Sequence, residues 1–283
     1  MSEIGDVPPG VDPTVATTAR LYDYFLGGTN NFPVDREVGE QIKAEVPYAV
    51  DAVLANRGFH GRAAVWMARH GIRQFIDLGS GLPTQNNTHE TVHRVTADAR
   101  VAYVDIDPMV AAHSDKLLAD DGTTAMITAD LREPEVVLGH PDLRRLIDFA
   151  EPVGLLSTDV LHFIADDADP WGVLRRYLAG TVPGSYVAIS HAVGDVLPAR
   201  EVQQQFDEVK ETLAKADVPF FGRPRAEVER FFEGLELLPP YEGAEPSISY
   251  AGLWGAEDPD AAESEGSHAF YCGVARRPDG FTA

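Results

Sequence analysis

The sequence is short of cysteine and of positive charge. Among its 283 residues Cys272 is the single cysteine, so no internal disulfide can form, as is usual in a reducing cytoplasm. Lys and Arg total 23 against 45 Asp and Glu, which gives a net charge of -22. Nucleic acids and anionic membranes bind basic surfaces, so this balance disfavours both as partners. It is compatible with a cationic ligand.

Long hydrophobic runs are also missing. No stretch approaches the roughly 20 apolar residues of a membrane helix. The first residues, MSEIGDVPPGVDP, contain neither the basic nor the apolar region of a signal peptide. We therefore expect a cytoplasmic protein without membrane contact. Apolar residues still make up 44% of the chain, enough for a sizeable core in one α/β domain with additions.

The chain divides into three parts by pattern. Residues 1–12 predict a disordered tail. Residues 13–72 predict a helical extension, because PTVATTARLYDYFLGG begins with Pro and ends with Gly-Gly, the usual asymmetry of a helix. From 73 to 283, short β-branched and aromatic runs alternate with helical stretches, which predicts a parallel sheet covered on both faces. The expected strands lie in 74–79, 100–107, 124–130, 152–160, 184–192 and 268–277, with a late helix and a strand in 226–238.

Residues 239–266 are acidic, rich in Gly, Pro and Ser, and free of Lys and Arg. This composition predicts a long, solvated surface loop. The alternative is that the segment forms a wall of an active site.

The first predicted strand ends in DLGSG, residues 77–81. Gly79 and Gly81 allow a ligand to approach the backbone closely, and the start of the following helix offers free N–H groups to an anion. The third glycine of a dinucleotide fingerprint is missing, because Leu82-Pro83 stands in its place. A diphosphate needs close approach along more of this loop, so NAD and FAD are disfavoured.

The next two predicted strands also end in an aspartate. Asp105 can accept hydrogen bonds from both hydroxyls of a ribose. Asp107 precedes Pro108 and fits a helix N-cap, which leaves Asp105 without a capping role. Asp130 can meet an adenine amino group, although a turn aspartate before REPE explains it equally well. The glycine loop, Asp105 and Asp130 end three successive predicted strands. This order supports the assignment of each of them to one ligand site.

This order resembles the class I S-adenosylmethionine (SAM)-dependent methyltransferases. Their glycine loop, ribose acid and adenine-side acid match DLGSG, Asp105 and Asp130. Further motifs resemble, more narrowly, a bacterial family named S-adenosyl methyltransferase, long catalogued as a domain of unknown function, over roughly residues 12–278. These motifs are RLYDYFLGGTNNFPVDRE, GLPTQNNTHE, VAYVDIDP, LHFIADDADP and PGSYVAISH.

The resemblance implies a Rossmann-like fold with a mostly parallel seven-stranded sheet, helices on both faces and an N-terminal helical extension. It implies SAM as cofactor and S-adenosylhomocysteine (SAH) as product, but it supplies no acceptor. The implied cofactor-binding residues are Gly79, Ser80, Gly81, Asp105, Ile106, Asp130 and Leu131.

Methyl transfer from a sulfonium needs alignment and exclusion of water, and a base only where the acceptor must lose a proton. In STDVLHFI, Asp159 and His162 are three residues apart, so they would share one side of a helical turn. The imidazole of His162 suits proton transfer, although a histidine packed against the sheet explains it as well. His191, at the end of the fifth predicted strand, is a second candidate.

The segment from Arg20 to Phe32 is a further candidate for the site. Gly27-Gly28 followed by Thr-Asn-Asn is an unusual helix end and suits a hinge for a lid over the cofactor. We count Arg20, Tyr22 and Gly28 with the cofactor site, with Arg20 directed at the cofactor carboxylate. Aromatic residues at this spacing in a helix belong more often to a core than to a site.

A SAM-dependent methyltransferase acting on a small molecule is therefore the first hypothesis. A non-catalytic protein that binds SAM or SAH, as a sensor or an interaction module, is the alternative, and an acceptor pocket with a placed base would distinguish the two. A nicotinamide-dependent oxidoreductase shares the sheet and the ribose acid, but the third glycine and a Tyr-x-x-x-Lys pair are missing. No metal ion is expected, and the acceptor and the oligomeric state do not follow from the sequence.

Overall fold

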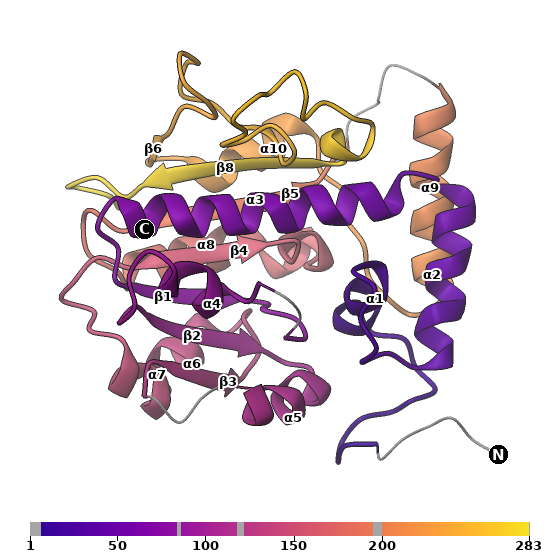
Figure 1. Ribbon diagram of the computed structural model, residues 1–283, viewed down its shortest axis with the longest axis horizontal. Coiled ribbons are helices and arrows are strands. Elements are labelled where there is room, and N and C mark those ends of the chain that lie inside the picture. Colours follow the sequence, from indigo (N-terminus) through magenta and orange to yellow (C-terminus); the bar gives the residue numbers. More distant parts are fainter. Residues whose placement is uncertain (1–6, 84–85, 118–121, 195–199, 283) are drawn as a thin grey trace.

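A mostly parallel sheet of eight strands forms the centre of the protein, and helices cover both of its faces (Figure 1). The computed structural model describes residues 7–83, 86–117, 122–194 and 200–282. The strands are β1 (Gln74–Leu78), β2 (Arg100–Asp105), β3 (Thr124–Thr128), β4 (Gly154–Thr158), β5 (Tyr186–Ala192), β6 (Glu236–Leu237), β7 (Ser249–Tyr250) and β8 (Phe270–Arg276).

The strand order is β3-β2-β1-β4-β5-β8-β6, and β7 pairs with β8 off this path. Seven strands thus form the predicted sheet, and the two-residue β7 is an addition that the sequence pattern did not indicate. Strand β1 pairs in parallel with both β2 and β4. The order of the chain therefore reverses between β1 and β4, and in sheets of this kind ligands bind beside that reversal, at the carboxyl ends of the strands.

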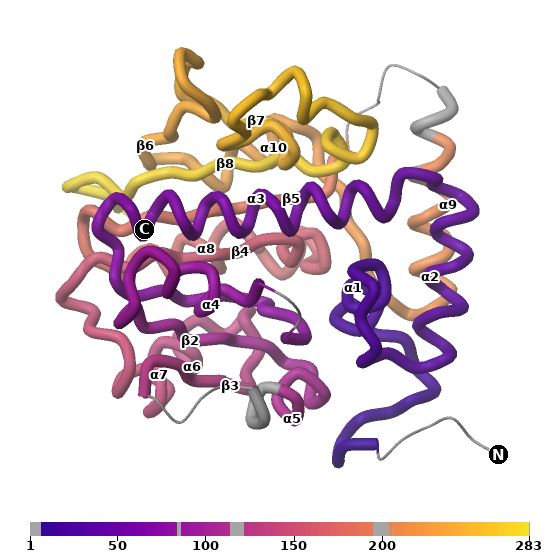
Figure 2. The backbone as a smooth tube through the Cα atoms, viewed as in Figure 1, coloured from indigo at the N-terminus to yellow at the C-terminus, as the bar shows by residue number. Residues whose placement is uncertain are grey.

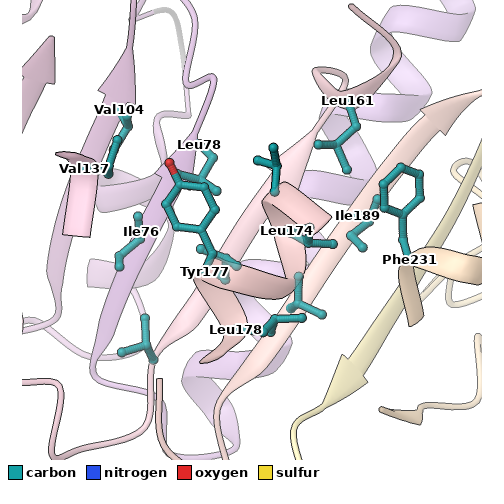
Figure 3. Packing of buried hydrophobic residues seen from close by; sticks show 14 of the residues in the cluster. Ile76, Leu78, Val104, Val137, Leu161, Leu174, Tyr177, Leu178, Ile189 and Phe231 are labelled. Carbon is teal, nitrogen blue, oxygen red and sulfur yellow. The ribbon is translucent and has the colours of Figure 1, made fainter. Parts of the chain in front are cut away.

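Alternate residues of each strand enter different cores. Ile76 and Leu78 face the layer that contains Tyr177 (Figure 3), whereas Phe75 packs on the opposite face with Phe59. All of these side chains are at most 1% exposed. Both faces of β1, β2, β4 and β5 are buried, which explains why these strands appear in the sequence as continuous apolar runs, whereas the edge strand β3 alternates in burial.

The helices of the chain begin and end as follows. They are α1 (Thr18–Phe25), α2 (Pro33–Glu45), α3 (Ala49–Arg69), α4 (Thr88–His93), α5 (Pro108–Leu117), α6 (Pro134–Gly139), α7 (Pro141–Leu146), α8 (Pro170–Ala179), α9 (Arg200–Lys215) and α10 (Arg225–Glu229), with the short 3-10 turns η1 (Leu161–Phe163), η2 (Asp166–Ala168), η3 (Arg230–Phe232) and η4 (Gly266–His268).

Helices α1, α2 and α9 lie together at the carboxyl ends of the strands (Figure 1). They share a small apolar cluster that includes Leu21, Ile42 and Leu213. Helix α1 begins at Thr18 and not at Pro13, because the Thr17 side chain accepts a hydrogen bond from the backbone N–H of Arg20 and so caps the helix. Two segments far apart in the sequence thus form one helical wall beside the sheet.

Helix α3 is the last helix of the predicted extension, and it packs along β4, β5 and β8. Residues 239–266 lie beside α3 and β8 (Figure 2). The Arg62 side chain of α3 donates hydrogen bonds to the carbonyl groups of Trp254, at 2.7 Å, and of Ala251, at 2.6 Å. Trp254 is 2% exposed and meets the ring of Phe59 edge-on. The acidic segment is therefore held by the burial of Trp254 and by hydrogen bonds from Arg62 to its carbonyl groups. Its high content of acidic residues gave no indication of these contacts.

No helix within the described part of the chain combines the length and the apolar character needed to span a membrane. Cys272 is fully buried in β8, as the apolar sequence around it predicts.

Candidate functional site

A cavity of about 460 Å³ lies between the carboxyl ends of β1, β2 and β4 and the helices α1, α2 and α9. This volume is typical of small-molecule sites, which span about 300–1,000 Å³. Its polar end is formed by the loops after β1, β2 and β3. Its other end, called here the apolar end, is lined by Phe25, Ile42, Val46, Phe163, Val209, Leu213, Val218, Pro219 and Phe220. None of residues 239–266 lines the cavity, so the acidic segment is not a wall of this site.

The loop after β1 turns sharply at two glycines. Gly79 and Gly81 have φ angles of 68° and 65°, in the left-handed region that glycine adopts without strain. A Cβ on Gly79 would overlap Val160, whereas a Cβ on Gly81 would meet no protein atom within 4 Å and would enter the cavity. Between them, the buried hydroxyl of Ser80 has no hydrogen-bond partner among the described residues. The loop therefore leaves both space and an unused polar group for a ligand.

Asp105 ends β2 and holds this loop in place. One of its carboxylate oxygens accepts the Gly81 N–H at 2.8 Å and the other accepts the Asp107 N–H at 2.9 Å. Burial raises the pKa of Asp105 to about 6. Each carboxylate oxygen retains lone-pair capacity for a further donor. Asp107 caps α5 through the Met109 N–H at 2.8 Å, as the sequence predicts.

The residues after β2 and β3 also line the cavity. Ile106 is 59% exposed, an unusual position for a large apolar side chain that borders a cavity. Asp130 accepts hydrogen bonds from the backbone and side chain of Arg132. Burial alone would raise the pKa of Asp130, but these hydrogen bonds and the Arg132 charge lower it below its ordinary value. Leu131 completes this side of the polar end.

Asp159 and His162 meet in the cavity, as their spacing predicts. The Asp159 Oδ1 and His162 Nε2 atoms are 3.3 Å apart. The backbone N–H of Ala192 points to His162 Nδ1 at 3.2 Å. Since a backbone N–H can only donate, Nδ1 is the acceptor of this hydrogen bond and Nε2 is the ring atom that faces Asp159. His162 therefore lies beside Asp159, and the carboxylate retains acceptor capacity for a ligand.

The backbone of Asp159 is also fixed. Its φ is 59°, a left-handed conformation that Asp and Asn tolerate better than most other residues. The Asp159 N–H is 3.0 Å from Ser190 Oγ. Ser190 donates to Asn56, and the Asn56 amide is 3.0 Å from the Tyr22 hydroxyl. This chain of hydrogen bonds links β4 to α1 across the cavity.

Tyr22 lines the cavity, in agreement with its selection from the sequence. Burial, and next the charge of Asp159, raise the pKa of the Tyr22 hydroxyl. The hydroxyl therefore stays protonated and can serve as a hydrogen-bond donor or acceptor beside Asp159.

His60 of α3 is a lining residue that the sequence analysis missed. Its ring bridges the hydroxyls of Thr158, at 2.9 Å, and Thr88, at 2.8 Å, and Thr88 donates to Asp77. Burial lowers the pKa of His60 to about 4, so the ring is neutral near pH 7. The sequence carries no signal for this role, because His60 stands in an ordinary helical pattern.

Arg20 and Gly28 do not line the cavity. Arg20 is 1% exposed and its Nε lies 3.0 Å from the Asp35 carboxylate, so its charge is already used inside the protein. Gly28 is required by close packing, since a Cβ there would overlap Asp23. Asp23 in turn accepts a hydrogen bond from the Asn31 side chain. The Gly-Gly-Thr-Asn-Asn turn is therefore built around a buried carboxylate, which accounts for its unusual sequence.

His191 is also outside the cavity. Along β5 it points to the face opposite Ser190 and Ala192, as alternation in a strand requires. It lies between the Ala192 carbonyl, 2.9 Å from Nδ1, and the Arg223 guanidinium, 2.8 Å from Nε2. Burial, and next the neighbouring His162, lower its pKa well below the ordinary value. His191 is thus a neutral structural residue, which corrects its assignment as a catalytic candidate.

Comparison with known proteins gives a consistent result. A family model described as S-adenosyl methyltransferase matches residues 6–278. A DUF574 family protein from Streptomyces avermitilis MA-4680 is 38% identical, with a TM-score of 0.85 over 93% of this chain and 98% of the other. A structure from Thermobifida fusca YX is also 38% identical, with a TM-score of 0.85 over 95% of this chain and 98% of the other. No curated protein matches.

Both similar structures align along nearly their whole lengths, so the likeness includes the helical wall as well as the sheet. The chain belongs to the S-adenosyl methyltransferase family and is a SAM-dependent methyltransferase.

Proposed function

We propose that the cavity binds SAM at its polar end and a small-molecule acceptor at its apolar end, with Asp159 at the junction. The observation that carries this proposal is the continuity of one cavity from Gly79 and Asp105 to the side chains of α2 and α9. A methyl donor and its acceptor must meet in one enclosed space, because transfer needs alignment and exclusion of water.

The residues of the polar end fit this cofactor. Asp105 has lone pairs for the two ribose hydroxyls, and exposed Ile106 offers an apolar surface to the adenine ring. The hydroxyl of Ser80, which has no partner among the described residues, and the open space beside Gly81 suit the methionine part. Asp130 would accept the adenine amino group. When bound, SAM supplies a methyl group that its positively charged sulfur already activates.

The walls favour a small acceptor over a nucleic acid. The lining cations are Arg57 and Arg132. Arg132 pairs with Asp130 at 2.6 Å, and Arg57 donates to the Asn86 carbonyl at 3.1 Å. A nucleic-acid strand needs a basic groove along its phosphates, and this chain carries a net charge of -22.

Calorimetric titration of the purified protein with SAM, SAH and NAD tests the proposal. We expect micromolar binding of SAM and SAH and none of NAD, because Leu82-Pro83 occupies the place where a diphosphate would need a glycine. Binding of NAD in preference to SAH, or of none of the three, would contradict it.

A further inference from the structure

The helices that wall the apolar end contribute no charge to the cavity. Every described residue that lines it from α1, α2 or α9 is uncharged: Thr18, Ala19, Leu21, Tyr22, Phe25, Ile42, Val209 and Leu213. Three phenylalanines add to this lining: Phe163 from the turn η1 after β4, Phe220 from the segment after α9, and Phe270 from the start of β8. The body of an acceptor in this end therefore has to be apolar, and the aromatic lining suits a flat ring.

The lining of the cavity as a whole is negatively charged. The cavity is lined by four carboxylates, those of Asp77, Asp105, Asp130 and Asp159, and by two guanidinium groups. The difference, four minus two, leaves two negative charges, counted without the two histidine rings. SAM has a sulfonium, an ammonium and a carboxylate, so its net charge of plus one offsets one of the two. One negative charge then remains for the acceptor.

Asp159 is the lining carboxylate that borders the apolar end. Its Oδ1 lies 3.3 Å from His162 Nε2, and Oδ2 has no hydrogen-bond partner within the described residues. The side chain is 14% exposed, so the carboxylate is largely removed from bulk water. A charge in such a place interacts strongly with a partner of opposite sign.

We propose that the acceptor is an amine with an apolar, ring-containing body. It binds as the ammonium ion, with its nitrogen against Asp159 and its body against α1, α2 and α9. This inference rests on the proposed function of the cavity. An acceptor with a carboxylate is disfavoured, because it would place a second negative charge beside Asp159.

The proposed methyl transfer needs only the amine, SAM and Asp159. The ammonium nitrogen gives one proton to the Asp159 carboxylate and regains its lone pair. That lone pair forms the new nitrogen–carbon bond to the methyl group while the carbon–sulfur bond breaks, and the bonding electrons remain on sulfur. The products are a methylammonium ion and SAH, and the proton on Asp159 leaves to solvent. His162, whose Nε2 lies 3.3 Å from Asp159 Oδ1, is a positioning residue.

The test compares probes that share a body and differ in their polar group. SAH-saturated protein is titrated with 2-phenylethylamine, 2-phenylethanol and 3-phenylpropionate, and with the three corresponding indole compounds. We expect the amines to bind at least tenfold more tightly than the matched alcohols and carboxylates. We also expect the amines to be methylated when SAM replaces SAH, as read by mass spectrometry.

Asp159→Asn isolates the charge. Asn tolerates the left-handed backbone and has nearly the same size as Asp, so the fold is retained. We expect amine binding to fall at least tenfold while alcohol and SAH binding stay unchanged. Asp169→Asn is the matched control, because Asp169 has a φ of 49° and lies outside the cavity.

Each outcome has one meaning. SAH binding is measured first, so its absence contradicts the proposed function itself. If SAH binds but the alcohols or carboxylates bind as tightly as the amines, or no probe binds, the amine assignment is wrong and the methyltransferase function stands. Unchanged amine affinity in Asp159→Asn also overturns the assignment.

Discussion

Replacing Asp105 by Asn should weaken the binding of SAH and remove its dependence on pH. The carboxylate accepts the N–H groups of Gly81 and Asp107, one on each oxygen. An amide keeps one acceptor oxygen and presents an NH₂ group to the other N–H. The substitution therefore removes one anchor of the glycine turn and half of the acceptor capacity offered to a ribose.

The magnitude follows from the pKa of this group. Burial raises the pKa of Asp105 from 3.8 to about 6, so the ionised form is disfavoured by about 3 kcal/mol relative to water. Two ribose hydroxyls that donate to the carboxylate recover part of this cost when the ligand binds. We therefore expect Asp105→Asn to weaken SAH binding by about 1–3 kcal/mol, which is roughly 5- to 150-fold.

The pH dependence has a definite sign. The ligand's hydroxyls prefer the ionised carboxylate, so affinity in the wild type should be constant above about pH 6.5 and fall below pH 6, by up to about tenfold for each pH unit. The variant should show no such fall, and any titration of SAH itself is common to both proteins. Calorimetry between pH 5 and 8 measures this. Asp98→Asn controls for the change in net charge, since the Asp98 side chain is 90% exposed. Equal affinities of wild type and Asp105→Asn would refute the ribose assignment.

Three further substitutions test the glycine turn and the anchor of the acidic segment. Gly79→Ala should lower the free energy of unfolding by at least about 2 kcal/mol, from the overlap with Val160 and the positive φ, as thermal unfolding would show. Gly81→Ala should stay folded but bind SAH about tenfold more weakly, because its methyl group would fill ligand space; unchanged affinity would argue against a ligand at the turn. Arg62→Met should destabilise the protein by about 2 kcal/mol through the loss of hydrogen bonds to carbonyl groups, with SAH affinity unaltered and Arg69→Met on the same helix as control. An Arg62→Met protein as stable as the control would show that the segment is held by packing alone.

Much of the sheet could be predicted because β1, β2, β4 and β5 are buried on both faces. These four strands appear as continuous apolar runs, and Asp105 stands at the end of β2 as expected. Asp159 and His162 were found because they are three residues apart, but the geometry of their 3.3 Å contact also depends on β5, where Ser190 and Ala192 fix the Asp159 backbone and the His162 ring. Strand β7 was missed because two residues carry no periodicity.

The rest of the site depends on contacts between distant segments. His60 lies in an ordinary helix and reaches the cavity only because α3 crosses the sheet beside β4. Arg20 and Gly28 looked functional because their sequence is unusual, yet both serve buried carboxylates, of Asp35 and Asp23. His191 was expected in the site because it ends a strand, but which face of β5 it occupies depends on register. From a single sequence, polar residues that pack inside the protein cannot be distinguished from polar residues that bind a ligand.

The position of β8 in the sheet has a consequence for the synthesis of the protein. This strand lies between β5 and β6 and pairs along the whole of β5, from Tyr186 opposite Arg276 to Ala192 opposite Phe270. Between Ala192 and Phe270 the ribosome must add 78 residues (270 − 192), which takes roughly 4–16 s at ordinary bacterial and eukaryotic rates.

During that interval one edge of β5 has no partner strand, and the cavity lacks Ala269 and Phe270 from its lining. Unpaired edges of this kind promote association between chains. The emerging chain therefore passes through a stage at which it is most prone to self-association and has no finished pocket for its cofactor. SAM can stabilise the completed protein by binding to it, but it cannot assist folding before β8 is synthesised and the cavity is complete.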